Sequence, residues 1–238
     1  MGSIAGSKKL KRQMAPLFWG INRKNKRFVI TVMPGSHPKN SSIPTAVLLR
    51  DVLNVVTTLR EAKSVIYNGK VIVDGIIRKS LHHSIGLMDV VELQGVSDVY
   101  RLVPTHGHTL QPIKIETDEK SKKLVKVTSK TTIKGKKTQL GFHDGRTIIA
   151  ENDVNVGDSC LIQIPEQKIL DVIKLEKDSL VIVIRGINTG QVGRVNSINK
   201  GTFTLSKRIN LTIDKKTFEI PADLVIAVGK EKPVIQIK

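Results

Sequence analysis

Residues 58–93 read TLREAKSVIYNGKVIVDGIIRKSLHHSIGLMDVVEL, and this stretch decides the fold of the chain around it. Thr58 and Glu61 have the spacing of a capping box, in which the hydroxyl and the carboxylate each bind an amide left unpaired at a helix start. Apolar residues then recur every three or four positions, which predicts a helix with one buried stripe: Leu59, Ala62, Val65 and Ile66. Asn68-Gly69 is a typical helix end. We therefore predict a short helix that begins at Thr58.

The second half of this stretch has the pattern of a small β-sheet. The apolar residues of 71–73 alternate between two faces, and Asp74-Gly75 is the signal of a type I′ hairpin turn. Another turn at 86–89 leads into an apolar strand at 90–93. The predicted unit is a short helix packed on a small hairpin sheet, with cations on its outer face.

This pattern resembles the small RNA-binding module named after bacterial ribosomal protein S-four. That module has a T-x-R-E-A helix start, a G-x-V-x-V-(N/D)-G hairpin and a later apolar-x-x-G-D turn. The matching residues are Thr58, Arg60, Glu61, Ala62, Gly69, Val71, Val73, Asp74, Gly75 and Asp89, and Met88 stands where the module usually has Gly. The resemblance implies an RNA face, for which the candidates are Arg60, Lys63, Tyr67, Lys70, Arg78 and Lys79. The module serves ribosomal proteins, pseudouridine synthases and other RNA enzymes.

The composition argues against a membrane or secreted protein. Of the 238 residues 39% are hydrophobic, and the mean hydropathy is −0.08. No apolar run approaches the ~20 residues of a membrane helix, and the basic residues 8–12 are followed by no apolar signal region. Cys160 is the only cysteine, so neither an intrachain disulfide nor a Cys-x-x-Cys metal site can form. We expect a protein of the reducing cytoplasm with no membrane partner.

The net charge of +18 is concentrated in two parts of the chain. Residues 1–50 hold ten Lys or Arg and no Asp or Glu, and residues 101–150 hold eleven bases against four acids. Uncompensated cations of this density favour a polyphosphate partner, because binding releases counterions from the nucleic acid. Aromatic residues make up only 3% of the chain. That argues against a stacking platform for single strands and for backbone and shape contacts with folded RNA.

Residues 1–43 are expected to form an extended, partly disordered basic arm. Its RNA-binding candidates are Lys8, Lys9, Lys11, Arg12, Arg23, Lys24, Lys26, Arg27 and His37. Phe18 and Trp19 lie between the basic clusters, and we expect them to dock the arm on the globular body. Stacking on a base is the alternative. A helix is predicted after Pro44, with Leu48, Leu49, Val52, Leu53 and Val56 on its buried face.

From residue 98 onward the pattern predicts β structure. The candidate strands of a central β domain are residues 100–103, 113–116, 124–128, 147–150 and 161–164. Residues 120–137 carry eight lysines, which we interpret as a hairpin that tracks phosphates rather than a solvated one. Arg146 follows a turn at 144–145 and is expected to face RNA.

Residues 173–238 form the last predicted unit, and their glycine spacing resembles the KOW motif. Gly186, Gly190 and Gly193 lie between apolar strands at 180–184 and 191–195. Glycine permits positive φ and a close approach of an RNA backbone. The RNA-binding candidates here are Arg185, Asn188 and Gly190. The resemblance implies a small five-stranded β-barrel.

No catalytic signature was found in the sequence. It contains neither a Gly-x-Ser-x-Gly elbow nor a Gly-x-x-x-x-Gly-Lys loop. His106 and His108 could clip a metal, but no Cys or acid lies near them in sequence, so we expect no metal site. We predict no catalytic residue, no cofactor and no small-molecule substrate.

The order of the parts resembles one family over nearly the whole chain. A basic arm with Trp19 and Gly35-Ser36-His37 precedes the module, the string HDGRTI at 143–148, the KOW-like unit and VIAVGK at 225–230. This order is similar to that of the S-four-E (S4e) family of small-subunit ribosomal proteins of archaea and eukaryotes. The end of the chain, without a long basic tail, favours the archaeal form. The resemblance implies small-subunit ribosomal RNA and neighbouring ribosomal proteins as partners, and a cytoplasmic, ribosome-associated location.

The predicted fold is α+β and mostly β. We expect the basic arm at 1–43, the S-four-type module at 44–97, the central β domain at 98–172 and the KOW-type barrel with its tail at 173–238. The predicted function is a non-enzymatic, structural constituent of the small ribosomal subunit that binds ribosomal RNA through phosphate-backbone contacts. Two alternatives remain, an RNA-modifying enzyme guided by the module and a KOW-type transcription factor.

Overall fold

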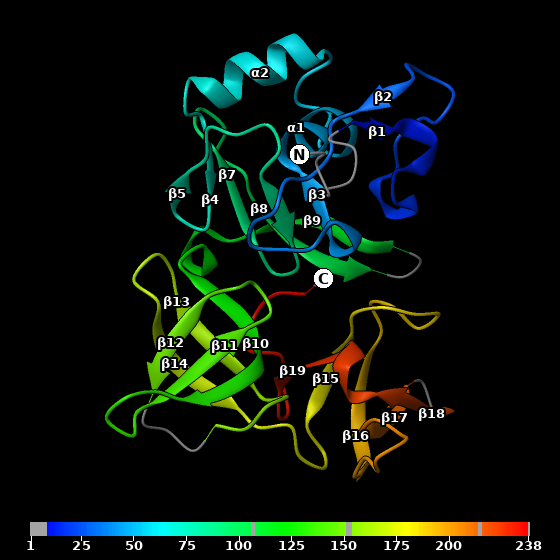
Figure 1. The fold of residues 1–238 in the computed structure, drawn as a ribbon, viewed down its shortest axis with the longest axis vertical. Coiled ribbons are helices and arrows are strands. Elements are labelled where there is room, and N and C mark those ends of the chain that lie inside the picture. Colours follow the sequence, from blue (N-terminus) through cyan, green and yellow to red (C-terminus); the bar gives the residue numbers. More distant parts are fainter. Residues whose placement is uncertain (1–8, 106–107, 151–153, 214–215, 238) are drawn as a thin grey trace, which may run out of the picture.

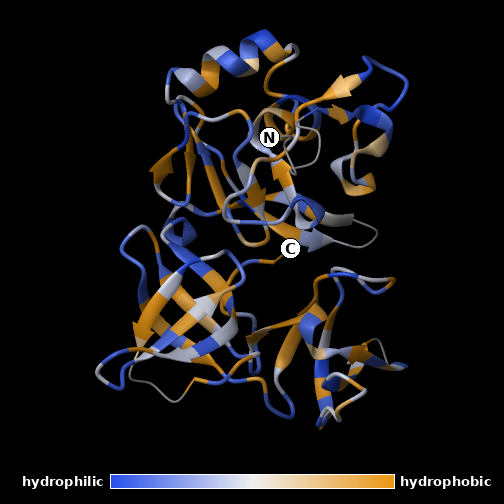
Figure 2. Ribbon diagram, viewed as in Figure 1, coloured by the Kyte–Doolittle hydropathy of each residue, from blue (hydrophilic) through white to orange (hydrophobic). Residues whose placement is uncertain are grey.

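Three five-stranded antiparallel sheets form the main units of the chain in the computed structural model (Figure 1), which describes residues 9–105, 108–150, 154–213 and 216–237. One sheet lies with the short helices in the upper half of the view, and the other two lie side by side below it. Hydrophobic residues concentrate on the strands of all three sheets, while the connecting loops are mostly hydrophilic (Figure 2). The chain is therefore mostly β with few helices.

The module consists of a short helical segment, a longer helix and a five-stranded sheet. The segment consists of α1 (Thr45–Val47) and a π-helical turn (Leu48–Val52), and α2 spans Leu59–Tyr67. The sheet has the order β5-β4-β7-β8-β9. Its strands are β4 (Val71–Val73), β5 (Ile76–Ile77), β7 (Val90–Leu93), β8 (Val99–Thr105) and β9 (His108–Ile115). This sheet crosses the boundary that we expected at residue 98, because β8 pairs with β7 along 90–92.

The local signals of the module are present as the sequence predicts. Thr58 and Glu61 form the capping box of α2, and Asp74 and Gly75 both have positive φ in the turn between β4 and β5. Ala62 and Ile66 of the predicted stripe are buried, whereas Leu59 is exposed. Met88 has a φ of +63° at the position where the module usually has Gly. Its fully buried side chain packs in the core, which offsets the cost of this backbone conformation.

The central unit is a sheet with the order β12-β11-β10-β13-β14. Its strands are β10 (Lys122–Thr132), β11 (Thr138–Phe142), β12 (Thr147–Ala150), β13 (Ser159–Gln163) and β14 (Lys168–Ile173). The first half of β10 pairs with β13, and after a bulge at Val127 its second half pairs with β11. The sequence did not indicate β11 or β14.

The C-terminal unit is a sheet with the order β18-β17-β16-β15-β19. Its strands are β15 (Leu180–Val183), β16 (Val192–Asn199), β17 (Arg208–Ile213), β18 (Lys216–Pro221) and β19 (Val225–Gly229). The tail then returns between the units, where Ile235 and Ile237 are buried. The buried Arg101 holds it by donating to the carbonyl of Gln236 (3.3 Å) and to Glu119 (2.6 Å).

The arm is folded against the module along residues 9–43, which corrects the expectation of an extended arm. Strands β1 (Leu10–Lys11) and β2 (Phe28–Val29) pair with each other, and β3 (Ser42–Pro44) pairs with β6 (Ser84–Gly86). Trp19 is fully buried in the main core, and its Nε1 donates to the carbonyl of Ser42 (2.8 Å). The prediction that Trp19 docks the arm is confirmed. No helix among the described residues is both long and apolar enough to cross a bilayer.

Candidate nucleic-acid interface

Helix α2 presents a cationic stripe to solvent. Arg60, Lys63 and Tyr67 lie three or four positions apart and are all exposed, so they share one face of the helix. The Lys63 ammonium lies 5.5 Å from the centre of the Tyr67 ring. Lys70 and Lys79 are also exposed, and Arg78 is half-buried. The structure thus gathers the predicted candidates of the module on its outer surface.

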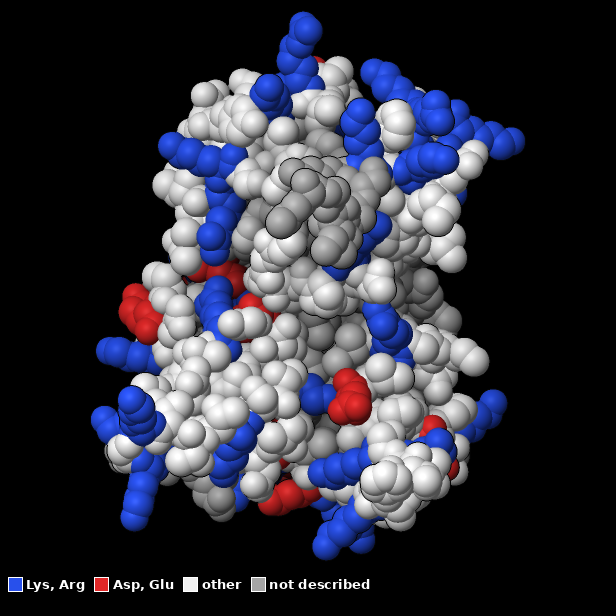
Figure 3. All heavy atoms as spheres, in the orientation of Figure 1, with Lys and Arg blue, Asp and Glu red and all other residues white. Residues whose placement is uncertain are grey.

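The arm adds a second group of exposed cations. Lys9, Lys11, Lys24, Lys26 and Arg27 are exposed, while Lys8 lies outside the described residues. Arg23 is half-buried and donates to the carbonyls of Gln13 (2.7 Å) and Ala15 (2.9 Å), so its guanidinium also closes the arm's own loop. In Figure 3, blue side chains are dense at the upper right, where Figure 1 places β1 and β2, and red ones are few there.

Two predicted RNA contacts in the arm are wrong, because the side chains are buried. Arg12 is 5% exposed and donates to the carbonyls of Lys26 (2.9 Å) and Asn22 (3.1 Å). Its guanidinium supplies donors for a loop whose carbonyls would otherwise lack partners. His37 is 3% exposed, and its Nε2 lies 3.1 Å from Asp89 Oδ1. Both residues therefore hold the arm in place instead of facing solvent.

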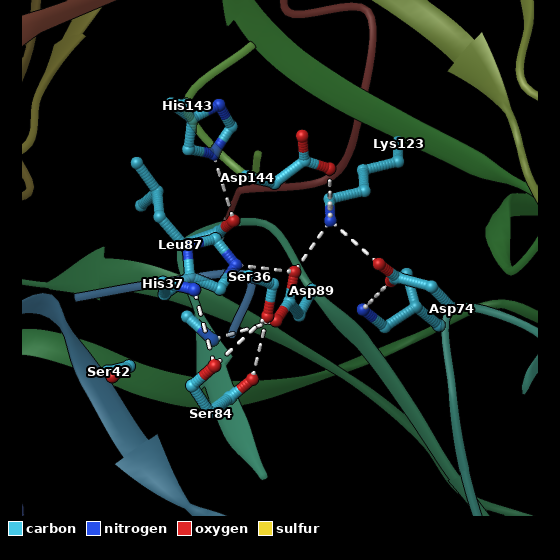
Figure 4. A network of polar contacts seen from close by, with 12 residues as sticks. Ser36, His37, Ser42, Asp74, Ser84, Leu87, Asp89, Lys123, His143 and Asp144 are labelled. Atoms are coloured by element: carbon cyan, nitrogen blue, oxygen red, sulfur yellow. Dashed lines mark hydrogen bonds and ion pairs between the residues drawn. The ribbon is translucent and has the colours of Figure 1, made fainter. Parts of the chain in front are cut away.

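Lys123 is the centre of a buried ionic network that joins the arm, the module and the central sheet (Figure 4). Its ammonium lies 2.7 Å from Asp74, 2.6 Å from Asp89 and 3.0 Å from Asp144, and its side chain is 1% exposed. Asp89 also accepts hydrogen bonds from the backbone amide of Gly86 (2.8 Å), and Asp74 accepts from that of Val90 (3.0 Å). Lys123 donates hydrogen bonds to Asp74 and Asp89, while Asp144 Oδ2 faces it as an ion pair without a hydrogen bond.

The charges in this network shift one another's protonation. Burial favours the neutral carboxyl, but Lys123 and His37 outweigh it and hold the pKa of Asp89 well below its ordinary value. For Asp74 burial prevails, and its pKa is raised. Burial opposes the charge of Lys123, yet the three carboxylates raise its pKa. The network therefore keeps Lys123 charged in a place where a lone ammonium would be neutral.

His143 lies beside the network and is held as a neutral imidazole. Its Nδ1 accepts from the backbone amide of Lys126 (3.1 Å), so its Nε2 is the nitrogen that donates to the carbonyl of Leu87 (3.2 Å). Burial, together with the nearby charge of Lys123, lowers the pKa of His143 to about 4. The HDGRTI string thus builds a junction between two sheets rather than a site for acid–base chemistry.

Arg146 is another predicted RNA contact that the structure corrects. Its Nη2 lies 2.6 Å from Asp74, and its Nε lies 3.2 Å from Asp144. These two carboxylates turn the guanidinium toward the network, and the side chain is 15% exposed. Asp144 lies in the predicted turn before β12, but the ion partner Asp74 lies in the turn between β4 and β5 of the module.

The glycine loop after β15 has the backbone that the sequence predicts. Gly186 and Gly190 have positive φ, and Arg185 donates to the carbonyl of Asn40 in the arm (2.7 Å). Asn188 and Gly190 are half-buried, while Ile187 at the tip is 95% exposed. Arg185 therefore tethers the arm, and whether this loop contacts RNA stays a prediction.

The lysines of residues 120–137 fall into an exposed group and a buried group. Lys130, Lys134, Lys136 and Lys137 are exposed on the hairpin of β10 and β11, where they can follow phosphates. Lys126 is buried instead, and its ammonium donates to the carbonyls of Ala222 (2.7 Å), Asp223 (3.1 Å) and Val225 (2.8 Å). Burial lowers the pKa of Lys126 to about 8. Lys123 and Lys126 are the residues of this segment that sequence reasoning missed.

The described residues offer no metal centre, since none of their His, Cys, Asp and Glu side chains form a group of three or more that could hold an ion. Of the two histidines considered as metal ligands, His106 lies outside the described residues. Cys160 is buried in the central sheet, and burial raises the pKa of its thiol to about 11. This thiol is therefore neither exposed nor activated.

Comparison with known proteins identifies the family. The small ribosomal subunit protein eS4 of Methanothermobacter thermautotrophicus is 38% identical over 100% of this chain and 98% of its own length. The chain belongs to the S4e family. The eS4 protein of Ignicoccus hospitalis is 36% identical with the same coverage. The crystal structure of the 30S ribosomal protein S4e from Thermoplasma acidophilum has a TM-score of 0.70 at 30% identity, covering 81% of this chain and 97% of that one.

Two family profiles match separate parts of this S4e chain. The RS4NT domain matches residues 5–40, and the profile described as Ribosomal family S4e matches residues 96–169. The first contains His37, and the second contains Lys123, Asp144 and Arg146. The ionic network therefore connects the two matched segments, through the carboxylates of the module that lies between them.

Proposed function

We propose that this S4e protein, by its family a structural constituent of the small ribosomal subunit, binds ribosomal RNA through phosphate contacts from α2, the arm and the lysine hairpin. The observation that carries the proposal is the separation of charge. Asp74, Asp89 and Asp144 are buried against Lys123, whereas the cations of α2 and the arm are exposed. Among the described residues four cations (Arg12, Arg101, Lys123 and Lys126) and four acids (Asp74, Asp89, Asp144 and Asp158) are buried. The buried charges therefore cancel and the excess of cations lies on the surface, which favours a polyphosphate partner.

The fixed geometry of the units supports shape recognition rather than sequence readout. Phosphate contacts position a protein on folded RNA, and A-form helices offer backbone and shape more readily than base edges. Neighbouring small-subunit proteins are the second class of partner that we propose, and a cytoplasmic, ribosome-associated location follows from this function. No residue arrangement among those described favours the enzymatic or the transcription-factor alternative.

The salt dependence of RNA binding tests this proposal. A triple variant, Arg60→Gln, Lys63→Gln and Lys70→Gln, should lose about 0.7–0.9 in the slope of log K against log salt for each phosphate contact removed. A matched control neutralises three exposed lysines of the nearly neutral region, Lys168, Lys174 and Lys177, and should keep the wild-type slope. Equal slopes in the two triple variants would contradict the assignment of α2 to the RNA face.

A sedimentation experiment tests the assembly itself. The protein in a native lysate at low salt should migrate with the small ribosomal subunit and should be released as the salt concentration rises. Recovery in the soluble fraction alone, at low salt, would count against the function proposed.

A further inference from the structure

A basic groove lies at the seam between the arm and the module. It has a volume of about 700 Å³. Its lining comes from both parts of the chain: Lys9, Arg12, Asn22, Asn25, Lys26, Phe28, Val29, Ile30 and Thr31 of the arm, and Arg50, Asp51, Asn54, Val56, Thr57, Thr58, Leu59 and His82 of the module. This volume is in the range of about 300–1,000 Å³ that small-molecule sites occupy, and it admits one nucleotide. The groove exists because the arm is folded on the module, so sequence reasoning could not predict it.

Phe28 provides an aromatic wall of this groove. It lies on β2 and is 46% exposed, and it is the only Phe, Tyr or Trp among the lining residues. The Arg27 guanidinium lies 5.4 Å from the ring centre, and the Lys9 ammonium lies 6.0 Å from it. An exposed ring in a basic setting is the usual platform for a nucleic-acid base, because the base stacks while the cations meet its phosphates.

Uncharged polar side chains also line the groove. Asn54 and Thr57 line the groove from the module, and Asn25 lines it from the arm. Asn54 is exposed and has a φ of +53°. An asparagine amide carries both donors and an acceptor, so it can pair with the edge of an unpaired base.

The charge of the groove selects an anionic strand. Its only acidic lining residue, Asp51, is neutralised by Arg50 at 2.6 Å, and Arg12 is engaged by backbone carbonyls. Lys9 and Lys26 also line the groove, and both side chains are exposed. Lysines that line the same groove as an aromatic ring can meet the phosphates of a strand whose base stacks on that ring.

We propose that this groove binds one unpaired nucleotide of ribosomal RNA, with its base stacked on Phe28 and its flanking phosphates against Lys9 and Lys26. The inference rests on the function proposed above and adds a site that phosphate tracking alone does not require. A base within a helix has both faces covered by its neighbours, so only a bulged or single-stranded nucleotide can use the ring.

The test compares two RNA hairpins that differ by a single bulged adenosine, with a fluorescent end label and anisotropy as the readout for the full-length protein. The wild-type protein should bind the bulged hairpin roughly five-fold to a hundred-fold more tightly than the hairpin without a bulge. Phe28→Leu keeps an apolar side chain of similar size but removes the aromatic face, and should abolish this preference without changing the salt slope. Asn54→Gly tolerates the positive φ and should reduce the preference.

Phe203→Leu is the matched control, because Phe203 is a fully exposed ring in the C-terminal unit, away from the groove. It should keep the wild-type preference for the bulge. A wild-type protein that binds both hairpins equally, or a Phe28→Leu variant that retains the preference, would overturn the site while leaving the proposed function intact. Failure to bind either hairpin would overturn both. Displacement of the bulged hairpin by an equimolar amount of adenosine monophosphate would overturn the RNA assignment in favour of a free nucleotide.

Discussion

Replacing Lys123 by methionine should uncouple the module from the central sheet. The substitution keeps the length and volume of the side chain but leaves three carboxylates, at 2.6–3.0 Å from the ammonium, without their shared counter-charge. Asp74 and Asp144 retain Arg146, whereas Asp89 retains only His37 and a backbone amide. Loss of one partner from a buried ion pair costs about 3–5 kcal/mol. We expect the free energy of unfolding to fall by about this amount.

Urea unfolding followed by the fluorescence of Trp19 provides the measurement, because this single tryptophan is buried on the module side of the network. In the wild-type protein the lowered pKa of Asp89 contributes stability above the unfolded value near 3.8, and this stability is lost as the pH falls through the folded value. In Lys123→Met that contribution is missing at pH 7. The difference between the two proteins should therefore persist from pH 7 to about 4 and shrink as the pH falls further, toward the folded pKa of Asp89.

Lys122→Met is the control, since Lys122 is the exposed neighbour of Lys123 on the same strand. It should change the stability by less than about 0.5 kcal/mol. Adding Asp89→Asn to Lys123→Met should recover part of the loss, because it removes the buried charge that lacks a partner. A loss below about 1 kcal/mol in Lys123→Met, or one independent of pH, would refute the view that this network holds the units together.

Three further changes have defined outcomes. Lowering the pH from 6.5 to 4 should destabilise the protein by up to about 3 kcal/mol through His143. The unfolded imidazole takes up its proton near pH 6.5, whereas the folded one does so only near pH 4. Urea titrations at several pH values should show this loss of stability, and His143→Gln should reduce it. Gly86→Ala should lower the melting temperature, because a Cβ there would clash with the buried His37 ring, at a cost of about 1–3 kcal/mol. An unchanged melting temperature would show that the ring can move freely. Cys160 should resist a disulfide reagent at pH 8 in the native protein and react once urea unfolds it, and rapid native labelling would contradict its burial.

Features that depend on a few neighbouring residues were predictable from the sequence. The capping box of Thr58 and Glu61 and the turn at Asp74-Gly75 form as expected, because each is decided by hydrogen bonds and φ angles within four residues. The docking of Trp19 was predictable as well, since a lone large aromatic between polar clusters gains most by burial. Each of these features follows from residues that are close together in the sequence.

The ionic network was not predictable, because its partners are far apart in the chain. Lys123 lies 49 residues from Asp74 and 34 from Asp89, and it is one of eight lysines in a short segment. Nothing in that segment distinguishes the two buried lysines from the exposed ones. The same reason explains the errors at Arg12, His37 and Arg146, whose charge indicated RNA while their contacts depend on tertiary structure. The exposed candidates on α2 and the arm remain predictions.

Strand β10 has a consequence for how the protein enters a large assembly. Lys123 and Lys126 lie three positions apart and therefore project from opposite faces of the strand, one to the carboxylates of the module and the other to carbonyls of the C-terminal unit. Strand β10 is thus fixed to a different unit on each of its two faces. The spacing between the module and the C-terminal unit is therefore fixed before the protein meets its binding partner, so little orientational freedom is lost on association. A protein with this fixed spacing can act as a rigid template on which a more flexible RNA segment adopts its final conformation.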